Sequence, residues 1–322
     1  MKKILIAFAA LALVLILATG AMFYFRPIAS FERLGRRALA GAGLVRGVVT
    51  GPSGPIEVWS GGSGPVVILV HGANDYAGTW ARVAPALLAR HRVVAFDLPG
   101  HGNSAPQTGP LSVGDLVAGI EAVVAKEQAP VTLVGNSLGG WLSLIVAKRR
   151  PEAVGHVVLV NGAATESKFA DGIDLLPKDR ASAQRVMAAA MAPGAPATPG
   201  FVLDDIVRRA PGSALARLQA KPIEREWFID EAIPTLDLPV SILWGEADRV
   251  LPLEYARSFA PLFRRSRLET LPSCGHIPQR ECPEALAAAL LRALGAPPPP
   301  AASPSMPAEP VPGPGPGADR RP

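Results

Sequence analysis

Val131-Thr-Leu-Val-Gly-Asn-Ser-Leu-Gly-Gly-Trp141 is the stretch that decides the fold. Its first four residues are apolar or β-branched and predict a buried strand, whereas Leu138 to Arg150 has helical spacing. Between them stands Gly-x-Ser-x-Gly, and a sharp turn from strand to helix exposes the hydroxyl of such a serine. Gly135 and Gly139 leave room for the turn because they have no Cβ atoms. The stretch therefore predicts that Ser137 is a nucleophile.

A nucleophile of this kind needs hydrogen-bond donors for the oxyanion that forms on the substrate. The amide of Leu138 lies at the start of the predicted helix, where an anion is stabilised. A second donor is predicted in His71-Gly72-Ala73, which follows the apolar run 66–70. Gly72 lets the backbone pass close to the site, so the amide of Ala73 is the other candidate for the oxyanion hole.

A serine hydroxyl also needs a general base, and the base needs an acid that orients it. His276 follows the predicted strand 268–271, and loops after parallel strands gather at the sheet edge where Ser137 emerges. We therefore predict His276 as the base. The four other histidines either precede a strand or come earlier in the chain: His71, His91, His101 and His156.

Two carboxylates, Glu246 and Asp248, follow the predicted strand 240–244. We predict Asp248 as the acid, because the order Ser137, Asp248, His276 matches the chain order of hydrolases with this strand–turn–helix serine. The competing interpretation is that Asp248 only caps the helix that follows it.

Strands and helices alternate along the chain. Apolar runs predict strands at 45–50, 56–60, 66–70, 93–96, 131–134, 157–160, 240–244 and 268–271. Helical spacing is present at 76–89, 112–127, 138–150, 253–263 and 283–294. This alternation predicts an α/β fold, with a mostly parallel sheet covered by helices on both faces.

The interval of about 165–233 contains several amphipathic helical pieces and no strand signal. A compact domain does not accommodate a structureless loop of that length, so we predict an inserted helical cap, the alternative being a long helix that flanks the sheet. The chain ends in a proline-rich segment that cannot bury a core. The predicted organisation is an anchor or signal at 1–27, a linker at 28–44, an α/β domain at 45–295 and a disordered tail at 296–322.

Ile4 to Phe25 is an uncharged run after Lys2 and Lys3, long enough to span a bilayer and ending in aromatic residues. It predicts a membrane anchor with an exported catalytic domain at the periplasmic or extracellular face. A cleaved signal peptide and a secreted protein are the alternative. Arginines follow the run as well, so charge does not settle the orientation.

Composition excludes some classes of function. The formal net charge is +5, but the arginines are scattered and do not form a stripe with interleaved aromatics, so we predict no nucleic-acid partner. Cys274 and Cys282 are the two cysteines. They do not form a C-x-x-C motif, so no metal site is predicted. They form either a disulfide or two free thiols.

Five motifs in this order resemble the α/β-hydrolase family: His71-Gly72, Asp97-Leu-Pro-Gly-His-Gly-Asn-Ser104, Gly135-Asn-Ser-Leu-Gly139, Gly245-Glu-Ala-Asp248 and Gly275-His276. The resemblance covers about residues 45–295. It implies a central sheet of about eight strands, an inserted cap and no cofactor. Haloalkane dehalogenases and epoxide hydrolases look similar but use aspartate where this chain has Ser137, which argues against both reactions.

The expected function is hydrolysis of a carboxylic ester through an acyl-enzyme, with a small-molecule or lipid-like ester as substrate. The apolar N-terminus and small cap resemble membrane-anchored monoacylglycerol lipases and bacterial esterases. A carbon–carbon bond hydrolase or an acyltransferase on the same fold is the alternative. The complete set of serine, acid and histidine argues against a non-catalytic binding protein.

Overall fold

The computed structural model describes residues 2–165 and 173–295. Within them, one eight-stranded sheet has the strand order β1-β2-β4-β3-β5-β6-β7-β8. β2 is antiparallel to β1 and β4, and every other neighbouring pair is parallel. The strands are β1 (Val45–Gly51), β2 (Gly54–Gly61), β3 (Val66–Val70), β4 (Arg92–Phe96), β5 (Val131–Asn136), β6 (Val154–Val160), β7 (Val240–Gly245) and β8 (Ser266–Leu271).

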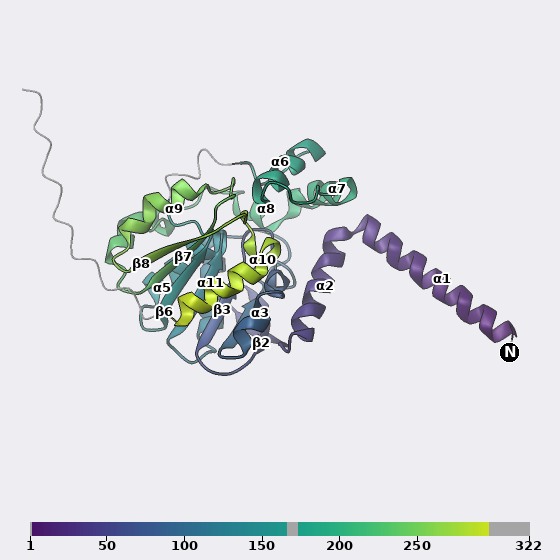
Figure 1. The fold of residues 1–322 in the computed structure, drawn as a ribbon, viewed down its shortest axis with the longest axis horizontal. Coiled ribbons are helices and arrows are strands. Elements are labelled where there is room, and N and C mark those ends of the chain that lie inside the picture. The colour runs from purple at the N-terminus through teal and green to yellow at the C-terminus, as the bar shows by residue number, and fades with distance from the viewer. Residues whose placement is uncertain (1, 166–172, 296–322) are drawn as a thin grey trace, which may run out of the picture.

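Helices cover both faces of the sheet (Figure 1), which confirms the predicted fold class. One face carries α4 (Val113–Val124), α5 (Leu138–Arg149) and α9 (Leu253–Phe259), and the other carries α3 (Ala84–Leu88) and α11 (Pro283–Gly295). The remaining helices are α1 (Lys2–Phe25), α2 (Pro27–Gly41), α6 (Arg180–Ala190), α7 (Gly200–Arg209), α8 (Ala214–Leu218) and α10 (Pro278–Glu281). Short 3-10 turns are η1 (Ala77–Trp80), η3 (Ala210–Gly212), η4 (Arg225–Trp227), η5 (Asp230–Thr235) and η6 (Ala260–Leu262).

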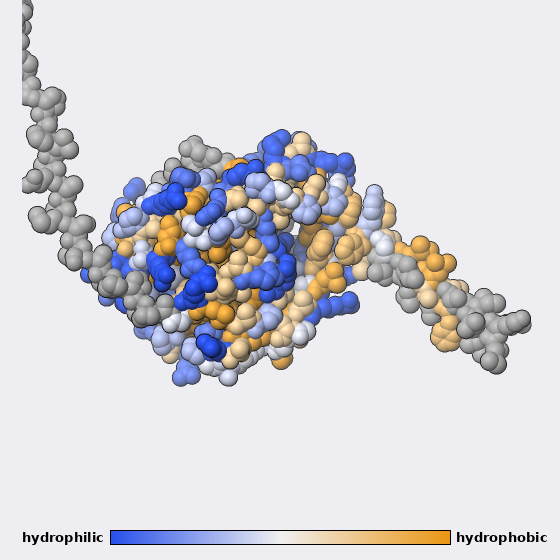
Figure 2. Space-filling view, in the orientation of Figure 1, coloured by the Kyte–Doolittle hydropathy of each residue, from blue (hydrophilic) through white to orange (hydrophobic). Residues whose placement is uncertain are grey.

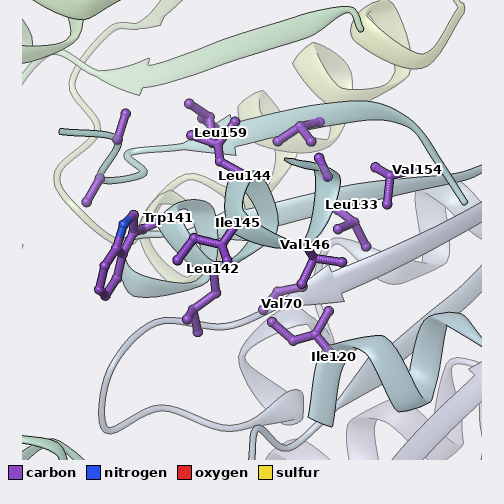
Figure 3. Packing of buried hydrophobic residues seen from close by; sticks show 14 of the residues in the cluster. Val70, Ile120, Leu133, Trp141, Leu142, Leu144, Ile145, Val146, Val154 and Leu159 are labelled. Atoms are coloured by element: carbon purple, nitrogen blue, oxygen red, sulfur yellow. The ribbon is translucent and has the colours of Figure 1, made fainter. Parts of the chain in front are cut away.

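Strand β3 shows why the sheet needs cover on both sides. All five of its residues are buried. The side chains at even positions pack with α4 and α5, while those at odd positions pack with α3 and α11. Figure 3 shows part of the first core, in which Val70 and Leu133 of adjacent strands lie with Ile120 of α4 and Leu142 of α5. A strand buried on both faces is apolar throughout, which made it recognisable in the sequence.

The predicted helix over 76–89 is divided in the structure. Residues 77–80 form the 3-10 turn η1, and α3 begins only at Ala84. Pro85 lies in the first turn of α3, where its missing N–H costs nothing, but it could not have continued an earlier helix. The helix predicted over 112–127 is α4, which begins with a capping box formed by Ser112 and Asp115.

The chain between β6 and β7 contains α6, α7 and α8, which lie together at one end of the molecule (Figure 1). Residues 173–239 are the helical insertion. Residues 166–172 of the predicted cap lie outside the described residues, as does the predicted tail, 296–322.

At the N-terminus, α1 extends away from the body (Figure 1) and exposes apolar side chains on its described part (Figure 2). Over residues 2–165 and 173–295, no helix combines the length and the apolarity that a membrane crossing requires. The predicted membrane anchor is therefore wrong, and so is the membrane-anchored or exported location that was inferred from it.

Two aromatic side chains at the end of α1 contact the rest of the protein. Phe23 packs edge-on against Phe31 of α2, with 5.5 Å between ring centroids. Tyr24 stacks on Phe201 of α7 at 5.3 Å. These rings contact the protein itself, which the hydropathy of the segment alone could not reveal.

Helix α2, in the range predicted as a linker at 28–44, docks on the sheet through buried charge. The Nε atom of Arg36 donates to Oε1 of Glu57 at 2.9 Å, and its Nη2 atom donates to Oδ2 of Asp97 at 3.0 Å. Glu57 is 2% exposed and Asp97 is fully buried. The hydroxyl of Tyr76 also donates to the carbonyl of Phe31 in α2 at 2.9 Å. The helix therefore neutralises two carboxylates that the sheet domain buries.

Candidate active site

Ser137 stands alone between the end of β5 and the first residue of α5, in a backbone conformation that serine rarely adopts. Its φ is +53° and its ψ is −120°. A Cβ added at Gly135 would lie 2.3 Å from the carbonyl oxygen of Gly139, and one at Gly139 would lie 2.5 Å from those of Val70 and His71. Only glycine fits at both positions, so the two glycines hold the turn that projects the serine.

The structure brings His276 to this serine. The Nε2 atom of His276 lies 2.9 Å from Oγ of Ser137, and its Nδ1 atom lies 2.7 Å from Oδ2 of Asp248. The side chain of His276 is 8% exposed and that of Asp248 is fully buried. With the proton on Nδ1 donated to the carboxylate, Nε2 is free to accept the serine hydroxyl proton, a tautomer assigned from these contacts. The three side chains thus form a continuous chain of hydrogen bonds along which one proton can be transferred.

Asp248 is held on both of its oxygens. Oδ1 accepts the amides of Val250 at 2.8 Å and Leu251 at 2.9 Å, while Oδ2 accepts from His276 and from Nδ2 of Asn161 at 2.7 Å. These four hydrogen bonds fix the orientation of the carboxylate. The rival carboxylate, Glu246, is exposed and accepts instead from the hydroxyl of Thr270 at 2.7 Å. Of the two carboxylates considered from the sequence, Asp248 therefore contacts His276, whereas Glu246 contacts Thr270.

The two candidate oxyanion donors lie on either side of Ser137. Leu138 is the first residue of α5, so its amide has no partner within the helix. Ala73 follows Gly72, where an added Cβ would stand 3.2 Å from Cβ of Ser137. The loop after β3 thus passes directly against the serine, with the backbone of Ala73 one residue farther on.

The remaining histidines are engaged elsewhere. Nε2 of His71 accepts the amide of Leu98 at 2.9 Å, and its burial lowers its pKa. Burial also lowers the pKa of His101 to about 3. His156 pairs with the hydroxyl of Ser241, and burial lowers its pKa to about 4. These three imidazoles are therefore neutral at pH 7. None of them takes part in the hydrogen-bond chain formed by Ser137, His276 and Asp248.

Three buried residues beneath the site were not identified from the sequence. Asn161 binds Asp248 and also accepts the amide of Gly245 at 3.1 Å. Asn136 donates to the carbonyls of Val160 at 2.9 Å and His276 at 3.1 Å, and it accepts from Nε2 of Gln279 at 2.9 Å. The available signal was positional, because both asparagines end strands at the same edge of the sheet as Ser137.

Both cysteines lie close to His276 in the sequence. Cys274 and Cys282 form a disulfide, with 6.0 Å between their Cα atoms, and it encloses the loop that carries His276. The structure thus selects one of the two states left open by the sequence. Within the described parts of the chain, no group of three or more His, Cys, Asp or Glu residues has a metal-binding arrangement.

Known proteins share this fold and much of this sequence. 2-Hydroxy-6-oxo-2,4-heptadienoate hydrolase of Pseudomonas putida is 32% identical over 238 residues, covering 68% of this chain and 85% of its own length. Pimeloyl-(acyl-carrier protein) methyl ester esterase of Methylococcus capsulatus is 31% identical over 234 residues, covering 67% of this chain and 89% of its own length. The crystal structure of a membrane phospholipase A, described as a bacterial virulence factor, matches with a TM-score of 0.71 at 28% identity, covering 91% of this chain and 98% of its own.

The family assignment rests on a match to a sequence profile that covers more than half of the chain. The sequence profile of the alpha/beta hydrolase family matches residues 67–289, which run from β3 to α11. That range contains the parallel part of the sheet, the turn of Ser137 and the loops of Asp248 and His276. The chain therefore belongs to the alpha/beta hydrolase family and is a hydrolase.

Proposed function

We propose that this hydrolase cleaves carboxylic esters through an acyl-enzyme formed on Ser137. The observation that carries the proposal is the pair of contacts made by one imidazole, 2.9 Å from Nε2 to Oγ of Ser137 and 2.7 Å from Nδ1 to Oδ2 of Asp248. A base in contact with a hydroxyl, and an acid in contact with the base, is the arrangement that activates serine.

The proposed reaction has two halves. Oγ of Ser137 attacks the ester carbonyl carbon while Nε2 of His276 takes the hydroxyl proton, and the amides of Leu138 and Ala73 stabilise the oxyanion. His276 then protonates the departing alkoxide, which leaves the acyl group on Ser137. Water attacks this acyl group, His276 takes a proton from the water, and the proton returns to Ser137 as the acid product leaves. Asp248 stays ionised and stabilises the imidazolium.

The helical insertion is proposed to be the cap that shapes the substrate pocket. It contacts the loop after β3, since the amide of Leu215 in α8 donates to Oδ1 of Asn74 at 3.0 Å. Arg217 of α8 also donates to the carbonyls of Pro106 at 2.8 Å and Gly109 at 2.8 Å. A segment fixed to the loop beside Ser137 is placed to contact a substrate there. The domain boundaries at 45–295 and 165–233 are part of this proposal.

Replacing Ser137 with alanine tests the proposal. The Ser137→Ala variant is expected to lose activity on p-nitrophenyl esters by about 10⁶-fold in kcat, with an unchanged circular dichroism spectrum. The control is Ser258→Ala, which removes a hydroxyl that donates to the carbonyl of Tyr255 in α9. A fluorophosphonate probe should label the wild-type protein and the control but not Ser137→Ala. Ester turnover retained by Ser137→Ala would refute the assignment.

Carbon–carbon bond hydrolysis is the second candidate, favoured by one observation. The 32% identical relative from Pseudomonas putida is named as a hydrolase of 2-hydroxy-6-oxo-2,4-heptadienoate, a vinylogous diketone. Both reactions use an activated serine, so the Ser137→Ala result does not separate them. The two reactions are separated by measuring steady-state rates on a p-nitrophenyl ester and on a vinylogous diketone with the same preparation. Ester turnover faster than diketone turnover supports the first proposal, and added alcohol that yields a new ester would reveal acyl transfer.

A further inference from the structure

The end of α6 meets the loops that carry the acid and the base. The amide of His276 donates to the carbonyl of Ala190, the last residue of α6, at 2.7 Å. The amide of Arg249, next to Asp248, donates to the carbonyl of Ala189 at 3.2 Å. The helical insertion is therefore bonded to the backbone at the base and at the neighbour of the acid.

One carboxylate fastens this junction. Oε2 of Glu281 accepts the amide of Gly275 at 2.7 Å, and Oε1 accepts the amide of Ala192 at 2.5 Å. Gly275 directly precedes His276, and Ala192 lies two residues beyond the end of α6. An ionised carboxylate makes stronger hydrogen bonds to amides than a neutral acceptor does. The same side chain thus joins the base loop to the helical insertion.

Backbone and side-chain atoms pack closely around Gly275 at this junction. A Cβ added at Gly275 would lie 2.4 Å from the carbonyl oxygen of Ala190 and 2.7 Å from Oε2 of Glu281. The carbonyl of His276 is held from below by Nδ2 of Asn136 at 3.1 Å. Backbone atoms before and after the imidazole are therefore fixed, on one side by the insertion and on the other by the turn of Ser137.

From this geometry we propose that Glu281 is a positioning residue, which sets the base His276 against Ser137 by binding the amides of Gly275 and Ala192 together. The inference rests on the proposed function, because it assigns Glu281 a part in serine activation. Glutamine at 281 keeps one acceptor and presents an NH₂ group to the second amide, so one of the two bonds is lost. Misplacement of a reacting group by 1 Å costs about 100-fold in rate.

The test compares Glu281→Gln with Glu284→Gln. Glu284 carries the same charge three residues farther on, but its carboxylate is exposed and pairs with the exposed Arg82 at 3.0 Å. p-Nitrophenyl acetate is the substrate, because so short an acyl group makes little use of a pocket. Glu281→Gln is expected to lower kcat by about 10- to 100-fold with KM changed less than about threefold, whereas Glu284→Gln matches the wild type.

Two further measurements separate positioning from general damage. The rate of inactivation by a fluorophosphonate should fall in parallel with kcat, because it reports attack by Ser137 without product release. The downfield proton resonance of Nδ1 of His276 should shift or broaden in Glu281→Gln and stay in place in Glu284→Gln. Should Glu281→Gln fail to fold, Glu281→Asp is measured instead, since its shorter side chain cannot span both amides.

The outcomes distinguish the two proposals. If Ser137→Ala is inactive and folded Glu281→Gln matches wild type in kcat, inactivation rate and resonance, the role of Glu281 is refuted while the serine mechanism stands. If Ser137→Ala retains full activity, the serine mechanism itself has failed. A fall in kcat and inactivation rate, with an unchanged far-ultraviolet spectrum, supports the role of Glu281.

Discussion

Helix α2 and the helical insertion both dock on the sheet domain, but different chemistry holds them. α2 is bound by side-chain charge, since Arg36 pairs with the buried carboxylates of Glu57 and Asp97. The end of α6 is bound mainly by backbone groups, with Glu281 as the bridging carboxylate. The second interface includes the backbone of His276, the proposed base.

The two kinds of contact should affect different properties, the free energy of unfolding in one case and the reaction rate in the other. Removing one partner of a buried ion pair leaves an uncompensated charge and costs about 3–5 kcal/mol. A single neutral hydrogen bond contributes only about 1 kcal/mol. Damage to α2 should therefore reduce the free energy of unfolding, while damage to the junction at α6 should reduce the rate first.

Deletion of the N-terminal helices should have the largest effect. A protein that begins at residue 42 lacks Arg36, so Asp97 loses its ion pair with α2 while Glu57 keeps its ion pair with Arg46. It also lacks Leu39, which is fully buried, so we expect it to be insoluble or unfolded. A protein that begins at residue 26 keeps α2 and should fold. Soluble yield and thermal unfolding by circular dichroism compare the two, and equal melting temperatures would contradict the assigned role of α2.

Replacing Arg36 with methionine should have the next largest effect. The variant keeps the volume of the side chain but loses both ion pairs, and we expect a loss of about 3–5 kcal/mol in urea-induced unfolding. Arg180→Met is the matched control, because Arg180 pairs with Asp204 where both side chains are more than half exposed. Exposed pairs contribute about 0–1 kcal/mol, so similar losses in the two variants would refute the contrast.

Acidification should weaken the sheet domain to a smaller extent. Burial lowers the pKa of His101 from 6.5 to about 3, so the folded ring stays neutral while the unfolded ring takes up a proton. The contribution is fully present above pH 6.5 and is lost as the pH falls below it, by about 1.4 kcal/mol per pH unit at most. His101→Gln should flatten the dependence of urea unfolding on pH between 6.5 and 4. An unchanged slope would show that another group causes it.

The smallest change in stability is expected at Arg249, on the insertion side of the comparison. Its guanidinium donates to the carbonyls of Ala188 and Met191 at the end of α6. Arg249→Met should lower the free energy of unfolding by less than about 1 kcal/mol, yet reduce kcat by several-fold because Asp248 is adjacent. A large loss in the free energy of unfolding with an unchanged kcat would contradict the proposed division of roles.

Local patterns account for what could be predicted from the sequence. β3 is an uninterrupted apolar run, the first four residues of β5 are apolar or β-branched, and the turn of Ser137 needs glycines at fixed positions, so all three can be read from neighbouring residues. His276 was predicted to lie near Ser137 from the rule that loops after parallel strands share an edge of the sheet. The signals for β3, β5 and the serine turn are each contained in one short segment.

Long-range contacts account for what could not be predicted. The ion pair of Arg36 with Asp97 joins residues 61 positions apart, and the bond of Glu281 to Ala192 joins residues 89 apart. No local pattern marks either partner. The N-terminal prediction rested on hydropathy alone, which does not show that Phe23 and Tyr24 contact α2 and α7.

The positive φ of Ser137 has a consequence for engineering. A backbone at +53° suits glycine better than serine, so a Ser137→Gly variant relieves local strain while it removes the nucleophile. Selection for heat resistance alone would therefore reward a protein that no longer reacts. Directed evolution of this chain must screen turnover together with melting temperature, since at this position the two properties oppose each other.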